Sequence, residues 1–261
     1  MKPAQENKTR GGSIKNSFAL PRSIAKALRE CAEKHGERGS PPTLPAIRYL
    51  WMSIADPRVA ADVQGRRARP RFAYEDWLNV VDEAASLGVQ YMVICTGVSL
   101  GSHPEVWKIC RWAQWLHGIE VGIHTRAAKL TAPEITALKR LDKNHTWLFV
   151  NKKDLSAFRP LKKDGVKVLE AQVDHEEHSP PCEMSKQMVF VGPQGILYTC
   201  GLVLNDDQFR MGHVSEKPLE QFVKDPDLPH TIPKGVPHRE SGCDACPPLM
   251  VKRMAGAPHA E

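Results

Sequence analysis

This sequence lacks the features that are typical of several protein classes, and each missing feature excludes one class. No apolar run approaches the roughly 20 residues that a membrane-spanning helix needs, so we expect no membrane partner. The first twenty residues, MKPAQENKTRGGSIKNSFAL, lack the apolar centre of a secretory signal, and we therefore expect a cytoplasmic protein. With 41% apolar and 25% charged residues, the composition excludes a mostly disordered chain, a collagen-like repeat and a coiled coil.

Recognition motifs for nucleotides and nucleic acids are missing as well. The glycines at 11–12 and the GPQG at 192–195 lack the strand-to-helix context of a phosphate-binding loop. No helix-turn-helix or RNA-binding motif occurs. The 36 Lys+Arg and 30 Asp+Glu give a net charge of +6, which is weak support for a nucleic-acid partner on its own.

What is present in the middle of the chain is an alternation of strand and helix patterns. We expect strands at 46–55, 89–97, 119–125, 146–151 and 165–173, and helices at 74–87, 104–118 and 132–141. Strands that alternate with helices at this spacing predict an α/β fold with a parallel sheet, either open or closed into a barrel. Between 151 and 165 a proline-interrupted segment leaves room for only one or two helical turns.

The chain divides into three predicted parts. Residues 1–40 form a basic N-terminal arm with a short helix at 21–35, and residues 41–179 form the α/β part. Residues 180–261 begin with a hairpin pattern at 186–203 and contain one weak helix at 219–224. Because this last part is poor in apolar residues, we expect it to need a staple rather than a core of its own.

The seven cysteines are distributed unevenly. Cys31, Cys95 and Cys110 stand within apolar patterns, where a buried thiol behaves as a small hydrophobic residue. Four further cysteines gather in the last third: Cys182, Cys200, Cys243 and Cys246. A Cys-x-x-Cys pair puts two thiolates on one tight turn, and a hairpin offers further ligands. Four such thiolates suit zinc and a 4Fe-4S cluster equally well.

The cysteine spacing resembles that of a known family. Cys182, twelve residues, Gly195, four residues and Cys200, followed by a distant cysteine pair, is similar to the auxiliary-cluster hairpin, called SPASM or twitch, of the radical SAM superfamily. The RMGHV segment at 210–214 and the stretch at 96–125 are also similar to parts of that family. The resemblance implies a partial (β/α) barrel with a small C-terminal hairpin lobe. It also implies one 4Fe-4S cluster held by the four cysteines named above.

The sequence departs from that family where S-adenosylmethionine would be cleaved. The family's Cys-x-x-x-Cys-x-x-Cys follows the first strand, but residues 54–72 contain no cysteine. The segment Thr96-Gly97-Val98-Ser99 lacks the glutamate that would hold the methionine amino group. We therefore expect a degenerate relative that does not use S-adenosylmethionine as a cofactor.

Other side chains mark the mouth of the predicted sheet, where ligands bind at the carboxyl ends of parallel strands. Arg66, Arg67, Arg69 and Arg71 replace the cluster-binding loop, and guanidinium groups bind phosphate or carboxylate. His124, Arg126 and His175 follow strands three and five. A histidine with a pKa near neutrality can act as a general base. We take the two histidines, together with Arg126 between them in the sequence, as candidate catalytic residues.

These observations leave three hypotheses. The first is an iron–sulfur protein with one cluster and an anionic small molecule or nucleic acid at the mouth of the barrel. Such a chain is a SAM-independent enzyme or an accessory subunit of a modification system. The second is a zinc-stapled nucleic-acid-binding module. The third is a radical SAM-like modifying enzyme with an unusual cluster site.

Overall fold

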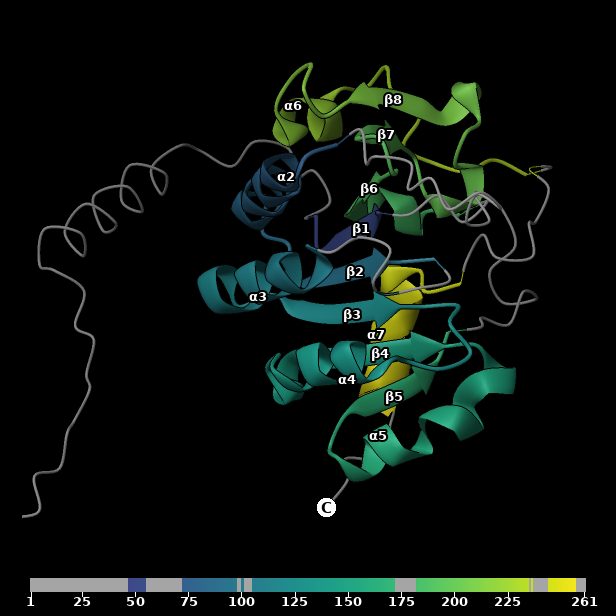
Figure 1. Ribbon diagram of the computed structural model, residues 1–261. Helices are drawn as coiled ribbons and strands as arrows, with labels where there is room; N and C mark the ends of the chain where they lie inside the picture. Colours follow the sequence, from purple (N-terminus) through teal and green to yellow (C-terminus); the bar gives the residue numbers. More distant parts are fainter. Residues whose placement is uncertain are drawn as a thin grey trace, which may run out of the picture. The chain divides into compact units, whose positions relative to one another are not determined.

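Eight strands make up one sheet in the order β5-β4-β3-β2-β1-β6-β7-β8 (Figure 1). The computed structural model describes residues 47–54, 72–97, 100, 105–171, 182–234, 236 and 244–256, all within one unit, Leu44–Glu261. The strands are β1 (Tyr49–Ser53), β2 (Tyr91–Cys95), β3 (Glu120–His124), β4 (Thr146–Val150), β5 (Lys167–Glu170), β6 (Met188–Val191), β7 (Ile196–Tyr198) and β8 (Arg210–His213). Neighbours from β5 through β1 to β6 are parallel, and β7 and β8 are antiparallel. This confirms the predicted α/β class and its mainly parallel sheet.

Helices lie on both faces of the sheet (Figure 1). On one face are α2 (Tyr74–Ser86), α3 (Val106–His117) and α4 (Ala132–Lys139), and on the other is α7 (Pro247–Gly256). The two remaining α-helices are α5 (Arg159–Lys163) and α6 (Leu219–Lys224). The 3-10 helices are η2 (Lys143–His145), η3 (Lys152–Phe158), η5 (Met184–Gln187), η6 (Gly201–Val203) and η7 (Asp207–Phe209). We call the face that carries α7 the inner face.

Residue alternation along each strand builds a separate core on each face. In β1, Leu50 and Met52 belong to the core that is shared with α2 and α3, whereas Trp51 belongs to the core that is shared with α7. Successive side chains of a strand point to opposite faces. Helix α2 buries Trp77, Val80, Val81 and Ala84, the spacing of a single helical stripe. Both cores therefore follow from strand and helix periodicity.

The ends of the helices follow local rules. The Thr131 side chain accepts a hydrogen bond from the Glu134 backbone N–H, and the Glu134 carboxylate accepts one in return from the Thr131 backbone N–H, a capping box. Helix α3 stops at Gly118, whose φ of 66° is left-handed, a conformation that glycine adopts without strain. The three long helices thus confirm the predicted segments, with ends shifted by a few residues.

The last third of the chain is better packed than its composition indicates. The predicted helix at 219–224 is present as α6, which buries Leu219 and Phe222 in the main core. Helix α7 was not predicted, and it buries Leu249 and Met250 on the inner face. The apolar side chains of this part thus belong to the two cores of the sheet, and the expected staple stays a prediction.

Two further segments differ from the prediction. The hairpin at 186–203 forms as β6 and β7, with a turn at Gly195 (φ 77°), but β6 pairs directly with β1 and extends the main sheet. Residues 152–163 make η3 followed by α5, more helix than the predicted one or two turns. Pro160 is accommodated because it lies in the first turn of α5, where no backbone N–H is required.

Some predictions lie outside the described residues: the N-terminal arm, the helix at 21–35 and the loop that carries the four arginines. Among the helices that are described, none has both the length and the apolar character for crossing a membrane.

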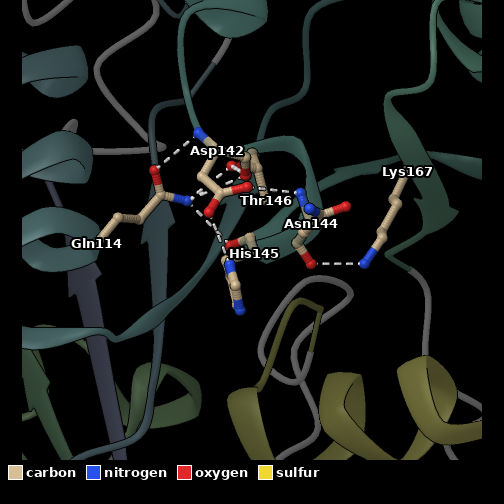
Figure 2. Close-up of polar contacts among 6 residues, drawn as sticks. All are labelled: Gln114, Asp142, Asn144, His145, Thr146 and Lys167. Carbon is tan, nitrogen blue, oxygen red and sulfur yellow. Dashed lines mark hydrogen bonds and ion pairs between the residues drawn. The ribbon is translucent and has the colours of Figure 1, made fainter. Parts of the chain in front are cut away.

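A polar network fixes the beginning of β4 against α3 (Figure 2). Gln114 of α3 donates from Nε2 to Thr146 Oγ1 at 2.7 Å and to the His145 carbonyl at 3.0 Å. Its Oε1 accepts from the Asp142 backbone N–H at 3.3 Å. Because Gln114 is buried, its side chain satisfies backbone groups that water does not reach. The network sets where β4 begins. This is the opposite end of the strands from the carboxyl ends, where the site described below lies.

We expect Gln114→Ala to lower the free energy of unfolding by about 2 kcal/mol, because it removes several buried hydrogen bonds and leaves their partners unsatisfied. Urea denaturation monitored by circular dichroism measures this. Gln221→Ala, at an exposed position of α6, is the matched control and should change stability by less than about 0.5 kcal/mol. Equal stability of the two variants would show that the network contributes nothing.

Candidate functional site

Three side chains from adjacent strands meet on the inner face: Trp51 in the middle of β1, and Cys95 and His124 at the carboxyl ends of β2 and β3. Trp51 Nε1 donates to Cys95 Sγ at 3.2 Å, and Cys95 Sγ lies 3.5 Å from His124 Nδ1. Cys95 and His124 are register partners in the pairing of β2 with β3. We call Trp51, Cys95 and His124 the inner-face trio. Its position is where parallel sheets bind ligands.

Burial controls the ionisation of the trio. It lowers the pKa of His124 to about 3, and the positive charge of Arg126 adds to this effect. It also raises the pKa of the Cys95 thiol to about 12, although the Trp51 hydrogen bond and Arg126 act in the opposite direction. Desolvation disfavours the charged form of both groups. At neutral pH the site therefore holds a neutral imidazole beside a neutral thiol.

One nitrogen of His124 has no hydrogen-bond partner among the described residues. His124 is 5% exposed, and its Nε2 is buried without a hydrogen bond to any of the described residues. Buried polar atoms in proteins nearly always have a protein, water or ion partner. The orphaned nitrogen marks the trio as a place where a group outside the described residues fits.

The loops after β2 and β3 are held together by their backbones. The Thr96 backbone N–H donates to the His124 carbonyl at 3.0 Å, and the Arg126 N–H donates to the Gly97 carbonyl at 2.8 Å. The Thr125 N–H in turn donates to the Phe149 carbonyl of β4 at 3.1 Å. These bonds continue the ladder past the ends of the strands, so the trio stands on rigid backbone.

Two segments from the last third of the chain reach this trio. A Cβ atom on Gly201, the residue after Cys200, would lie 2.5 Å from Trp51 Cη2, so only glycine allows this backbone to approach the indole. Asp244 is near enough to Cys95 for its negative charge to raise the pKa of the thiol. The Ala245 backbone N–H donates to the Ala171 carbonyl, which follows β5, at 3.2 Å.

The turn before Cys246 has an unusual backbone. Ala245 is fully buried and has a φ of 60°, a left-handed conformation that is uncommon for a residue with a Cβ atom. Such a conformation persists only where the surroundings impose it, and it often occurs at binding sites. The Cys246 turn is therefore held in a particular shape.

Three of the four cysteines proposed as ligands border one apolar cluster on the inner face. Cys200 and Cys246 are 7% and 6% exposed within it, and the half-buried Cys182 packs against it. The Cys182 N–H donates to the Ile232 carbonyl at 3.0 Å. The described residues contain no group of three or more His, Cys, Asp or Glu side chains placed to hold one metal ion. Cys243 lies outside the described residues.

The catalytic roles predicted for His124, Arg126 and His175 stay predictions. His124 lies on the inner face at the predicted strand end, but a pKa of about 3 removes the reason for expecting a general base near neutral pH. The half-buried Arg126 lies just beyond β3, near enough to affect both Cys95 and His124. His175 lies outside the described residues, as do Arg66, Arg67, Arg69 and Arg71.

The sequence analysis missed two members of the trio. Cys110 is buried in the core below α3, as predicted, but Cys95 is half-buried and bonded to polar partners. Trp51, within the apolar strand pattern at 46–55, was not among the predicted site residues. The available signal was strand alternation, because successive side chains of a strand point to opposite faces of the sheet. It was not sufficient, because the register between strands brings them together.

The solved structures that are similar to this chain include two of the protein SuiB from Streptococcus suis. The structure bound to the precursor peptide SuiA has a TM-score of 0.46 and 11% identity, and the alignment covers 85% of this chain and 74% of that one. The structure bound to S-adenosylmethionine has a TM-score of 0.41 and 10% identity, with 83% and 72% covered. Likeness at this level carries no inference about function. No protein-family model matches the chain, and no curated protein matches it.

Proposed function

We propose that this chain is an iron–sulfur protein that binds one 4Fe-4S cluster through Cys182, Cys200, Cys243 and Cys246, on the inner face of a partial (β/α) barrel. In this proposal the C-terminal hairpin and the turn before α7 supply the ligands. The chain does not cleave S-adenosylmethionine in the conventional way, because residues 54–72 carry no cysteine for a second cluster.

One observation carries the proposal: Cys182, Cys200 and Cys246, from three separate segments, border the same apolar cluster. These three segments are separated in the sequence and are brought to one face of the sheet by the fold. Cys243, which lies outside the described residues, precedes Cys246 by three residues in the sequence. Thiolates are the ligands that iron–sulfur clusters use in proteins.

The surroundings of these cysteines also fit a cluster. Cys200 and Cys246 are almost fully buried, and low solvent exposure is one of the properties that set a cluster's reduction potential. The orphaned His124 Nε2 lies in the trio that the Gly201 and Asp244 segments reach. The described residues do not gather three ligands around one point, so the proposal requires cluster binding to draw the cysteines together, as metal binding does in many small sites.

Metal analysis of protein purified without oxygen tests the proposal. We expect iron and acid-labile sulfide near four of each per chain, the composition of a 4Fe-4S cluster, together with broad visible absorption and a paramagnetic signal on reduction. Full occupancy by zinc in colourless protein would favour the zinc-stapled module instead. Formation of 5′-deoxyadenosine from S-adenosylmethionine on reduction would show that the catalytic cluster has an unexpected site.

A further inference from the structure

A cavity of about 180 Å³ lies between α6 and the strands β6, β7 and β8. Its lining is mostly apolar: Val189 and Leu197 come from the sheet, and Leu219, Phe222 and Val223 come from α6. These side chains belong to or pack against the core that is shared with α2 and α3. The cavity is therefore separate from the inner-face trio, which lies on the other face of the sheet.

The helix that covers the cavity is held at both of its ends. At the start of α6, the Leu219 backbone N–H donates to a Glu83 carboxylate oxygen of α2 at 2.6 Å, and α6 lies beside α2 (Figure 1). After α6, the Asp225 carboxylate accepts from Lys217 Nζ at 2.8 Å, and the Asp225 carbonyl accepts from His230 Nε2 at 2.7 Å. These contacts keep α6 from settling onto the sheet, so the cavity is preformed.

The polar groups that line the cavity gather beside the segment 229–230 and present hydrogen-bond acceptors. Ser185 Oγ donates its hydrogen to the His230 carbonyl at 2.7 Å, and Thr199 Oγ1 donates its hydrogen to the Pro229 carbonyl. Because a carbonyl only accepts, the hydrogen of a neutral His230 ring is on Nε2, which faces the Asp225 carbonyl. The two hydroxyl oxygens and His230 Nδ1 keep lone pairs for a ligand that donates.

We infer that this cavity binds a small neutral molecule with an apolar body of one or two rings and one N–H or O–H donor. An apolar cavity of about 150 Å³ stays dry and takes up benzene, so this slightly larger one has room for a compact ring system. The donor would meet Ser185, Thr199 and His230. A carboxylate fits poorly beside these acceptors, and the exposed Lys186 at the rim already pairs with Glu183. The inference goes beyond the proposed function and does not depend on an iron–sulfur cluster.

Titration of the full chain with indole, followed by isothermal calorimetry, tests the inference. We expect saturable binding at one site. Indene has the same shape without the N–H, so it should bind about fivefold more weakly. Val223→Phe places a ring in the cavity and should abolish indole binding while raising the melting temperature, as filling a cavity commonly does. Gln221→Phe is the matched control, because it adds the same ring at an exposed position of α6, and it should leave the affinity for indole unchanged.

Each contrary result overturns a defined part of the inference. Equal affinities for indole and indene overturn the hydrogen bond, and tighter binding of benzoate than of indole overturns the neutral ligand. Indole binding that persists in folded Val223→Phe overturns the site. If that variant does not fold, nuclear Overhauser contacts between indole and the methyl groups of Leu197 and Val223 in the wild-type protein decide, and their absence overturns the site. Failure of all three probes to bind overturns the cavity as a ligand site, whatever the iron content of the protein.

Discussion

Replacing Cys200 by alanine should remove the iron from protein purified without oxygen. A 4Fe-4S cluster takes one thiolate at each iron, and Cys200 belongs to the buried apolar cluster on the inner face with 7% exposure. Solvent therefore cannot easily replace it as a ligand. Cys246→Ala should have the same effect, because that thiol comes from the other segment that approaches the trio. Iron and sulfide assays, with circular dichroism to confirm folding, measure both.

The matched control for these variants is Cys110→Ala. Cys110 is a fully buried residue of α3, on the opposite face of the sheet. Its replacement therefore tests whether the loss of any buried cysteine lowers the iron content. It should keep the wild-type iron content. If Cys200→Ala and Cys110→Ala retain equal amounts of iron, the cluster is not held by the C-terminal cysteines.

The metal-free protein should lose stability in mild acid through His124. Burial lowers the pKa of this side chain to about 3, from an ordinary value of 6.5. Below pH 6.5 the unfolded chain binds a proton that the folded chain does not bind, so the free energy of unfolding falls as the pH falls. The loss amounts to about 1.4 kcal/mol per pH unit and ends near the folded-state pKa. The stabilisation is complete above pH 6.5.

His124→Gln removes this titration while keeping a polar side chain. The difference in unfolding free energy between wild type and variant should shrink by roughly 2–3 kcal/mol between pH 6.5 and pH 4.5. Urea denaturation at several pH values measures it. Because both proteins have the same carboxylates, the contribution of these groups to the pH dependence cancels in the difference. Parallel stability curves would mean that His124 titrates normally and is not buried as described.

Much of the fold was open to prediction because its signals are local. The stripe that α2 buries, the Thr131 cap of α4 and the glycine that ends α3 all act within a few residues. The same holds for the hairpin turn at Gly195. Helix α7 escaped prediction because its two prolines and scattered apolar residues resemble a loop. Only the inner face of the sheet supplies the surface that makes this helix favourable.

The candidate site was predicted in part. Its cysteines were found from spacing, and His124 from its place after a strand. Cys95 was assigned to the core because it fits an apolar strand pattern. Such a pattern does not tell which face of the sheet is covered by α2, α3 and α4 and which by α7. The pKa of His124 was also beyond reach, because desolvation depends on residues that are distant in the chain.

By itself, the sequence determined the alternation of strands and helices between residues 46 and 173, the α/β class and the cysteine spacing, since each depends on residues near one another in the chain. Only the tertiary structure decided that β6 pairs with β1 and that β2 and β3 align Cys95 with His124. It also decided that the Gly201 and Asp244 segments return to that point. Pairing between distant strands is set by the fit of whole faces, and no short stretch of residues carries that information.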